Sequence, residues 1–283
     1  MTGTLYIVAT PIGNLSDISK RAEQVLCDVD LIAAEDSRHA RTLLDQVGFT
    51  GKVVAYHDFS DQAKAQQLID KLQSGQSIAL ISDAGTPLIS DPGYKLVRAA
   101  REHDLMVIPI PGPSAVSAAL SVAGLPTDRF SFEGFLPSKK TARQKQLATL
   151  VNESRTLVFF ESTHRIEESL VDMSDAFGES RVVFLAREMT KKFEQHFFGS
   201  LKECIDWLKE DDLHKKGEFV LVVDGVSDSE TSAQNYDLGM ELVKELRHDV
   251  SLKRAVALAA KISGARKNEL YDAALKLESG PSN

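Results

Sequence analysis

Short apolar runs alternate with amphipathic stretches along the first 124 residues, and this rhythm restricts the fold more than any other feature of the chain. The apolar runs occupy residues 4–9, 31–34, 53–56, 78–81 and 106–110, and each is followed by a stretch with helical spacing of its apolar residues. A strand that is apolar throughout is buried on both faces. The alternation therefore predicts a mostly parallel sheet with helices on both faces.

The rhythm changes after Pro126, which predicts a second α/β unit with a mixed sheet. Expected strands cover 130–133, 156–161, 181–186 and 218–224, with 193–198 beside them. A polar run over 225–235 predicts a linker, and three short helices are expected at 239–246, 251–262 and 266–277. The predicted organisation is an N-terminal α/β domain over 1–126, a second α/β domain over 127–226, a linker over 227–236, and a helical C-terminal module over 237–283.

Composition excludes several protein classes. The chain has 283 residues, 43% of them hydrophobic, two cysteines and a net charge of −8. It has no apolar run of 18 residues and no basic segment before its first apolar run, so we expect no membrane span, no secretory signal and a cytoplasmic location. Two distant cysteines fit a reducing compartment. The acidic balance argues against a protein that coats nucleic acid by bulk charge, but it allows a local basic face.

The segment Ser82–Gly93, with the sequence SDAGTPLISDPG, joins an expected strand to an expected helix over 91–102. Such connections usually take roughly 2–6 residues, so twelve residues rich in turn formers exceed what a connection needs. Glycine admits a close ligand, and proline holds a turn rigid. Ligands of open α/β sheets bind at the carboxyl ends of strands. We therefore predict a ligand-binding loop, with Ala84–Ile89 facing the ligand and Asp91 and Pro92 beginning the next helix.

Four further loops follow expected strands, over residues 9–15, 109–119, 159–165 and 186–193. At 109–119 the small residues of a helix start would admit polar ligand atoms, although helix packing explains them equally well. The sequence has no GxxxxGK[ST], GxGxxG, HExxH or GxSxG motif, and its seven histidines form no i, i+4 pair. We expect no metal site.

These loops carry a resemblance to a known family. Residues 4–14, 83–93, 111–115 and 217–224 resemble the class III S-adenosylmethionine-dependent methyltransferases, which have the tetrapyrrole methylase fold. AEDSRH at 34–39, the 82–93 loop, FESTHR at 160–165 and AREMTK at 186–191 are similar to the branch that methylates small-subunit ribosomal RNA. The resemblance runs from about residue 4 to the C-terminus.

The resemblance implies a homodimer of two-domain protomers, with S-adenosylmethionine in the cleft between the domains. It also implies 2′-O-methylation of a cytidine ribose in the decoding region of 16S ribosomal RNA, either as free RNA or in the assembled 30S subunit. By matching motifs, the residues expected to contact the donor are Pro11, Ile12, Ala84, Gly85, Thr86, Ile89, Ser114, Ala115, Phe160, Phe219 and Val220.

The chain departs from the tetrapyrrole enzymes at two places. It has Pro11-Ile-Gly13 where they usually show Gly-Pro-Gly, and Thr86-Pro87 where they usually have Asp-Pro. Both departures argue against a tetrapyrrole substrate. Methylation of a tetrapyrrole-like small molecule stays an alternative, as does a non-catalytic ribosome-assembly factor that binds the donor.

A ribose 2′-hydroxyl is a poor nucleophile unless its proton is removed during attack, so a general base is expected. The family-specific loops offer Glu35, Asp36, Glu161, His164, Glu188 and Lys191. No spacing selects one of them; we name Glu161, Lys191 and Glu35 as catalytic candidates. A helix cap explains Asp36 equally well.

RNA binding requires positive charge, and basic residues cluster after residue 138, after residue 186 and in the expected C-terminal helices. Each cluster alone is also explained as a solvated face. The last two helices resemble a helix-turn-helix module, which would anchor RNA or support a dimer. The expected RNA contacts are Lys139, Lys140, Arg143, Arg187, Lys192, Lys253, Arg254 and Lys261.

Overall fold

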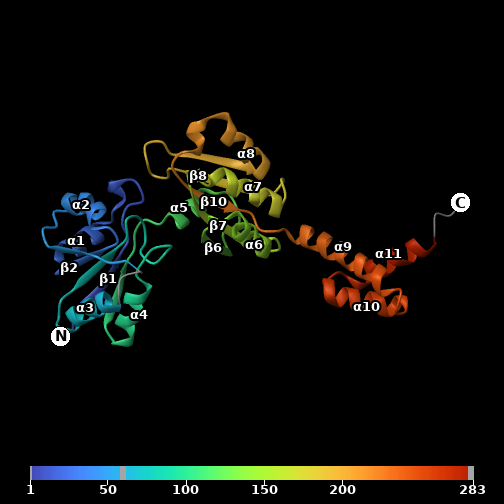
Figure 1. Ribbon diagram of the computed structural model, residues 1–283, viewed down its shortest axis with the longest axis horizontal. Helices are drawn as coiled ribbons and strands as arrows, with labels where there is room; N and C mark the ends of the chain where they lie inside the picture. The colour runs from blue at the N-terminus through green and yellow to red at the C-terminus, as the bar shows by residue number, and fades with distance from the viewer. Residues whose placement is uncertain (1, 58–61, 280–283) are drawn as a thin grey trace. The chain divides into compact units, whose positions relative to one another are not determined.

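The computed structural model describes residues 2–57 and 62–279, which divide into two compact units (Figure 1). The first unit, formed by Met1–Leu147 and Thr156–Val223, contains two five-stranded sheets. The second unit combines Ala148–Arg155 with the chain from Asp224 onward and contains the C-terminal helices. Among the helices of the described chain, none has the length and apolar character needed to cross a bilayer.

The first sheet is entirely parallel and has the order β3-β2-β4-β1-β5. Alternate residues of β4 face opposite sides: Ile78 and Leu80 join one buried cluster, and Ala79 and Ile81 join the other. Helices α3 and α4 cover the first side, and α1 and α2 cover the second (Figure 1). The prediction of a parallel sheet with helices on both faces is confirmed. The strands are β1 (Thr4–Val8), β2 (Leu31–Ala34), β3 (Lys52–Ala55), β4 (Ile78–Ile81) and β5 (Met106–Ile110), and the helices are α1 (Lys20–Asp28), α2 (Ser37–Gln46), α3 (Gln62–Gln73) and α4 (Tyr94–Glu102).

The second sheet is mixed, as predicted, and has the order β6-β7-β10-β8-β9. Strands β6 and β7 pair in parallel, and the other pairs are antiparallel. Helix α5 (Ala115–Val122) buries Val116, Ala119 and Leu120 in a cluster with residues of this sheet. The strands are β6 (Phe130–Phe135), β7 (Thr156–Ser162), β8 (Val182–Arg187), β9 (Gln195–Ser200) and β10 (Glu218–Val223), and the helices are α6 (Lys140–Leu150), α7 (Ile166–Phe177) and α8 (Leu201–Glu210).

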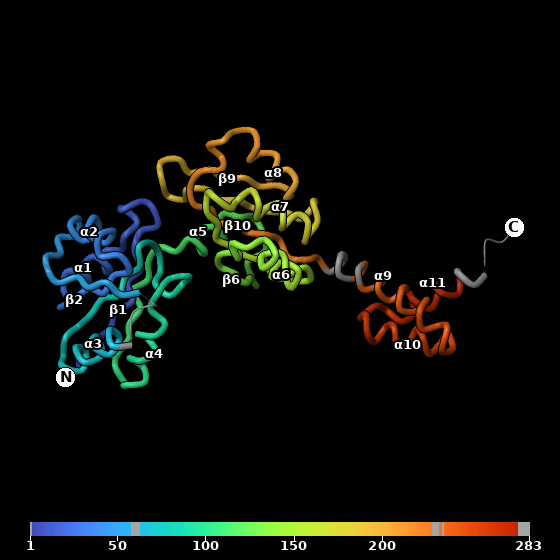
Figure 2. Tube along the Cα trace, viewed as in Figure 1, coloured from blue at the N-terminus to red at the C-terminus, as the bar shows by residue number. Residues whose placement is uncertain are grey.

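The C-terminal unit packs three helices around a small apolar core, and its chain is the orange-to-red end of Figure 2. The helices are α9 (Asp228–Leu246), α10 (Leu252–Ser263) and α11 (Lys267–Ser279). Val243, Val256 and Leu270 are buried in that core. Gly264 ends α10 with φ +77°, a left-handed conformation that glycine adopts without steric cost.

Two expected helix starts were wrong. The sequence predicts a helix capped by Ser16, but α1 begins after Ser19, whose hydroxyl accepts the Ala22 N–H, and Ser16 lies in a 3-10 turn capped by Asn14. Helix α4 begins at Tyr94, not at Asp91, because Gly93 with φ +136° stands at its N-cap.

The segment predicted as a linker, 227–236, is mostly helical because α9 begins at Asp228. It has no glycine or proline between 228 and 238 that would stop a helix. The sequence also predicts a helix from Asp61 to Leu72, and its expected start at Asp61 lies outside the described residues. The predicted domain boundaries stay a prediction.

Candidate active site

The loops that follow β1 and β4 are joined by main-chain hydrogen bonds. The Thr10 N–H donates to the Gly85 carbonyl (2.8 Å), and the Gly85 N–H donates to the Thr10 carbonyl (3.0 Å). The Thr86 hydroxyl donates to the Pro113 carbonyl (3.0 Å) and so connects the loop after β5. Because β1 lies between β4 and β5, the three loops meet at one edge of the sheet, where ligands of such sheets bind.

A cavity of about 380 Å³ opens beside this edge, and residues from both sheets line it. That volume lies in the range of pockets that bind small molecules. The lining is formed by Ile12, Glu35, Asp83, Ala84, Gly85, Thr86, Ile89, Ser90, Asp91, Ser114, Ala115, Phe135, Phe160, Glu161, Ser162, Met189, Lys191, Glu218, Phe219 and Val220.

Most residues that the sequence predicts for the site lie in this cavity. The lining includes the three catalytic candidates and every expected donor contact except Pro11, which is buried just before Ile12. These residues come from seven separate loops or strands, so the fold brings together what the chain keeps apart. Their roles toward a donor stay a prediction.

Glu161 has the geometry of a positioning residue. Its side chain is 1% exposed and its carboxylate accepts hydrogen bonds from the Ser162 N–H (2.8 Å) and the Ser169 hydroxyl (2.6 Å). Arg165 pairs with the same carboxylate at 2.9 Å. A base needs a lone pair directed at the proton that it removes, and these three partners already occupy both oxygens. The geometry therefore argues against Glu161 as the general base.

Lys191 is held as a cation. Its ammonium group lies 2.9 Å from a Glu188 carboxylate oxygen and 3.0 Å from a Glu218 oxygen. Burial lowers the pKa of Lys191, but the hydrogen bonds to these two carboxylates outweigh burial and raise the pKa overall. A lysine base needs a lowered pKa. The geometry therefore argues against Lys191 as the general base, although Lys191 still lines the cavity.

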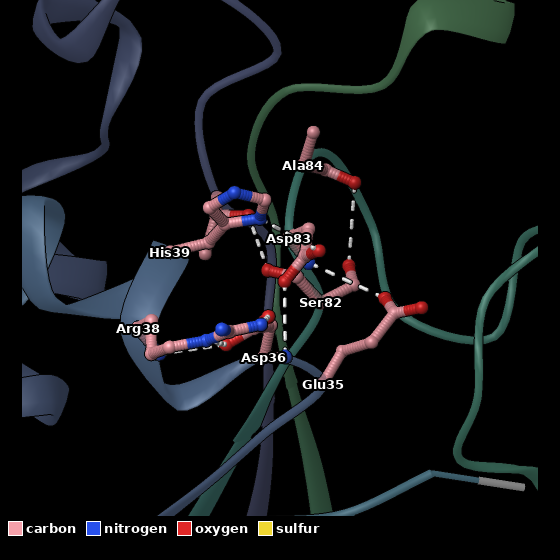
Figure 3. A network of polar contacts seen from close by, with 8 residues as sticks. Glu35, Asp36, Arg38, His39, Ser82, Asp83 and Ala84 are labelled. Atoms are coloured by element: carbon pink, nitrogen blue, oxygen red, sulfur yellow. Dashed lines mark hydrogen bonds and ion pairs between the residues drawn. The ribbon is translucent and has the colours of Figure 1, made fainter.

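A polar network surrounds Glu35 at the carboxyl ends of β2 and β4 (Figure 3). The Asp83 N–H donates to Glu35, and the Asp83 carboxylate accepts the Asp36 N–H at 3.0 Å and contacts Nδ1 of His39 at 3.2 Å. Asp36 is the N-cap of α2, and its bonds with Arg38 hold its pKa well below the usual range. The cap interpretation of Asp36 is the one that the geometry supports.

Asp91 lies in the cavity wall, three residues before α4 begins. Burial is the main cause that raises the pKa of its carboxyl to about 6, and the carboxylates of Glu35 and Asp83 act in the same direction. A hydrogen bond with the Ser82 hydroxyl acts in the opposite direction. The expectation that Asp91 begins a helix is wrong, because the turn at Gly93 separates it from α4.

Two of the expected RNA contacts are structural instead. Arg143 has a side chain 1% exposed, and its guanidinium pairs with Asp172 (2.6 Å) and Glu168 (3.0 Å). Arg187 is also buried, and its guanidinium donates to the Lys216 and Phe193 carbonyls. A guanidinium buried among protein acceptors is poorly placed to meet a phosphate, so the geometry argues against both residues as RNA contacts.

The other expected RNA contacts are exposed. Lys139, Lys140 and Lys192 lie on the first unit, and Lys253, Arg254 and Lys261 lie on α10 of the second. None of the six lines the cavity. Their role in RNA binding stays a prediction.

Sequence reasoning missed several lining residues, among them Phe135, Ser162, Met189 and Glu218. Phe135 and Ser162 end β6 and β7, so their positions at strand ends were an available signal. Met189 and Glu218 reach the cavity through the packing of the second sheet, which residue order does not reveal. Within residues 2–57 and 62–279, no three His, Cys, Asp or Glu side chains gather as a metal site requires.

Comparison with known proteins identifies the family. The pattern of the tetrapyrrole (corrin/porphyrin) methylases matches residues 4–205, and that of the RsmI C-terminal HTH domain matches residues 237–278. The chain belongs to the tetrapyrrole methylase family. Members of this family are methyltransferases that use S-adenosylmethionine as the methyl donor, which confirms the expected class of enzyme and cofactor.

Two similar relatives carry the same name, ribosomal RNA small subunit methyltransferase I. The protein from Escherichia coli O157:H7 is 52% identical over 97% of this chain and 95% of its own length. The protein from Vibrio cholerae serotype O1 is 53% identical over 94% of this chain and 92% of its own length. The chain therefore belongs to this branch of the family.

Solved structures share the fold at low identity. A cobalt precorrin-4 methyltransferase superposes with a TM-score of 0.58 at 16% identity and covers 77% of this chain and 94% of its own. A diphthine synthase superposes with a TM-score of 0.59 at 16% identity and covers 78% of this chain and 90% of its own. These likenesses confirm the tetrapyrrole methylase fold.

The chemical groups that line the cavity match those of S-adenosylmethionine. Phe160, Phe219 and Val220 offer apolar surface for an adenine ring, and Glu35, Asp83 and Asp91 offer carboxylates for the amino and hydroxyl groups. Gly85 has no side chain beside Ile12, where a Cβ would lie 3.3 Å from a methyl group. The main chain of the loop after β4 is therefore accessible to the donor.

Proposed function

We propose that this protein transfers a methyl group from S-adenosylmethionine to the ribose 2′-hydroxyl of a cytidine in the decoding region of 16S ribosomal RNA. One observation carries the proposal: about half of the residues are identical, over nearly the full chain, to those of relatives named ribosomal RNA small subunit methyltransferase I. The match of residues 237–278 to a helix-turn-helix domain adds support, since such modules bind nucleic acid.

The donor brings a sulfonium-bound methyl group, which the ribose oxygen attacks in line. The 2′-oxygen forms a bond to the methyl carbon while the carbon–sulfur bond breaks, and its electron pair stays on sulfur. The protein's part is to hold both reactants in line, to exclude water and to accept the hydroxyl proton. The apolar side chains of the cavity and the rigid 82–93 loop supply the first two requirements.

The proposal also includes the macromolecular substrate, the oligomeric state and the cellular location of the protein. We assign the 30S subunit or its RNA as the substrate particle, a homodimer as the working form and the cytoplasm as the location. The homodimer draws support from exposed apolar side chains at a groove beside α5, which Ile89 and Phe130 line. Light scattering of the purified chain measures the oligomeric state directly.

The experiment that tests the function uses labelled donor and small subunits from a strain that lacks the enzyme. We expect one methyl group per subunit, located on a cytidine ribose by nuclease digestion and mass spectrometry. Naked 16S RNA assayed in parallel distinguishes RNA from the assembled particle. Label on a base, on a protein or on no component of the subunit would contradict the proposal, and label on an added porphyrinoid would favour the tetrapyrrole alternative.

A further inference from the structure

Phe135 differs from the other aromatic side chains that line the cavity in how far it is exposed. It ends β6 and lines the cavity, yet it is 51% exposed. Phe160 is half-buried, and Phe219 is 2% exposed. A bound small molecule usually has roughly 70–90% of its surface enclosed. Phe160 and Phe219 therefore suit the donor, whereas Phe135 lies where the cavity meets solvent.

The ring of Phe135 is held in place by two neighbours. Phe160 packs against it edge to face, with ring centroids 5.6 Å apart and planes at 64°. The Arg165 guanidinium lies 5.8 Å from the ring centroid, within the range of a cation–π contact. Arg165 is itself fixed, because it pairs with Glu161 at 2.9 Å and donates to the Leu136 carbonyl at 2.9 Å. The ring is therefore a rigid surface, and half of it stays open to a ligand.

Positive charge lies close to this ring along the chain. Lys139 and Lys140 are exposed and follow Phe135 by four and five residues. Their Cα atoms therefore lie within about 18 Å of the Cα atom of Phe135. Proteins that bind single-stranded nucleic acid combine basic side chains for the phosphates with aromatic rings for the bases. The end of β6 and the segment that follows it have both elements.

An RNA acceptor enters the cavity under a constraint that the donor does not have. The target nucleotide stays connected to both of its neighbours, so its ribose reaches inward while its base stays nearer to the solvent-exposed edge of the cavity. Enzymes that act on one nucleotide take it out of its stack, and proteins hold such splayed bases on aromatic side chains. Phe135 is the exposed aromatic ring among the residues that line the cavity.

We propose that Phe135 is the stacking platform for the base of the nucleotide whose ribose is methylated. The inference rests on the proposed function, because it assumes a nucleotide acceptor. A ring that is already fixed by Phe160 and Arg165 loses little conformational freedom when a base stacks on it. Every base has a π-face, so this contact positions the ribose and does not select cytidine.

The test compares Phe135→Leu, Phe135→Tyr and the control Phe198→Leu. Phe135→Leu keeps an apolar side chain but removes the ring, and Phe135→Tyr keeps the ring. Phe198 is 59% exposed, belongs to β9 of the same sheet and is not among the residues that line the cavity. Methyl transfer at saturating donor is measured against the concentration of small ribosomal subunits from a strain that lacks the enzyme.

The loss of a stacked ring has a known size. Removing an aromatic partner weakens nucleic-acid binding by roughly 5- to 150-fold per base. We therefore expect kcat/KM for small subunits to fall at least about fivefold in Phe135→Leu, through a higher KM, because the contact is present before and during methyl transfer. Phe135→Tyr should stay within about twofold of wild type, and Phe198→Leu should match wild type.

Calorimetry with S-adenosylmethionine, light scattering and thermal unfolding separate base stacking from other roles of the ring. We expect donor affinity within about twofold of wild type, an unchanged oligomeric state and a folded protein in all three variants. Weaker donor binding in Phe135→Leu would assign the ring to the donor, and an altered oligomeric state would assign it to a contact between two copies of the chain. Either result overturns the inference.

The kinetic results decide the inference separately from the function. A kcat/KM of Phe135→Leu within twofold of wild type, or an equal loss in Phe135→Tyr, overturns the stacking role and leaves the proposed function intact. If wild type transfers no methyl group to a nucleotide, the proposed function is wrong and the inference is overturned with it.

Discussion

Replacing Gly85 with alanine tests the placement of the donor, and the chain offers a matched control. Gly85 and Gly48 both have φ +79°, but the alanine Cβ would lie 3.3 Å from Ile12 at position 85 and would meet nothing within 4 Å at position 48. A side chain in the left-handed region costs roughly 1–2 kcal/mol. Backbone strain should therefore be the same in both variants, whereas the added methyl group narrows the cavity only in Gly85→Ala.

The expected stability loss leaves both variants folded. A domain of this size loses roughly 2–4 °C of melting temperature per kcal/mol, so each variant should melt about 2–8 °C below wild type. The donor affinities should then differ. Ile12 lines the cavity, and the new methyl group must displace it by a few tenths of an ångström, so we expect Gly85→Ala to bind the donor at least about tenfold more weakly, or ~1.4 kcal/mol.

Isothermal titration calorimetry with S-adenosylmethionine and with its demethylated product measures this difference. Gly48→Ala should retain wild-type affinity for both ligands. Equal donor affinities in the two variants would refute the placement of the donor against the 82–93 loop. A melting loss in Gly85→Ala far beyond that of Gly48→Ala would instead show that the Thr10–Gly85 contact depends on glycine for folding.

Three further changes test other parts of the structure. Arg143→Met should destabilise the first unit by about 3–5 kcal/mol, because it leaves the buried Asp172 carboxylate without its cation, while Lys140→Ala should change stability by less than about 0.5 kcal/mol; urea unfolding measures both. Burial raises the pKa of Asp91 to about 6, so folding disfavours its charged form. Asp91→Asn should therefore melt at a higher temperature than wild type above pH 6, and the two should melt at the same temperature below about pH 4. A melting-temperature difference that does not change between about pH 4 and pH 6 would contradict the raised pKa. Charge reversal at Lys253, Arg254 and Lys261 should weaken RNA binding and lower the slope of log affinity against log salt by about 0.7–0.9 per lost phosphate contact, with donor affinity unchanged; an unaltered slope would assign these side chains to a structural role.

The sequence predicted the fold class because its signals are local. Apolar runs such as Ile78–Ile81 mark strands buried on both faces, and their alternation with helices settles the architecture of the first sheet. Strand-end loops also mark the cavity, since the carboxyl ends of adjacent parallel strands meet at one edge. The position of the 82–93 loop at the cavity could therefore be predicted from residue order alone.

The roles of individual charged residues could not be predicted in this way. Arg143 and Lys139 lie four positions apart in one basic cluster, yet only Arg143 faces a buried carboxylate, which is contributed by α7 nearly thirty residues later. The sequence predicts a helix start at Asp91, before Pro92 and Gly93. Only the backbone conformation of Gly93 shows that α4 begins at Tyr94. Ionisation and pairing depend on contacts between distant segments, and these are absent from local patterns.

The hydrogen bonds that join Thr10 to Gly85 use no side chain of the loop after β4: two run between main-chain atoms, and a third runs from the Thr10 hydroxyl to the Gly85 carbonyl at 3.4 Å. Ala84 and Ile89 line the cavity and their side chains take no part in that contact, whereas the Thr86 hydroxyl bonds to the Pro113 carbonyl. Substitutions at Ala84 and Ile89 can therefore reshape the cavity while these hydrogen bonds are kept. The loop is therefore a suitable place to engineer acceptance of donor analogues with bulkier transferable groups, because recognition and scaffold are carried by different atoms of the same residues.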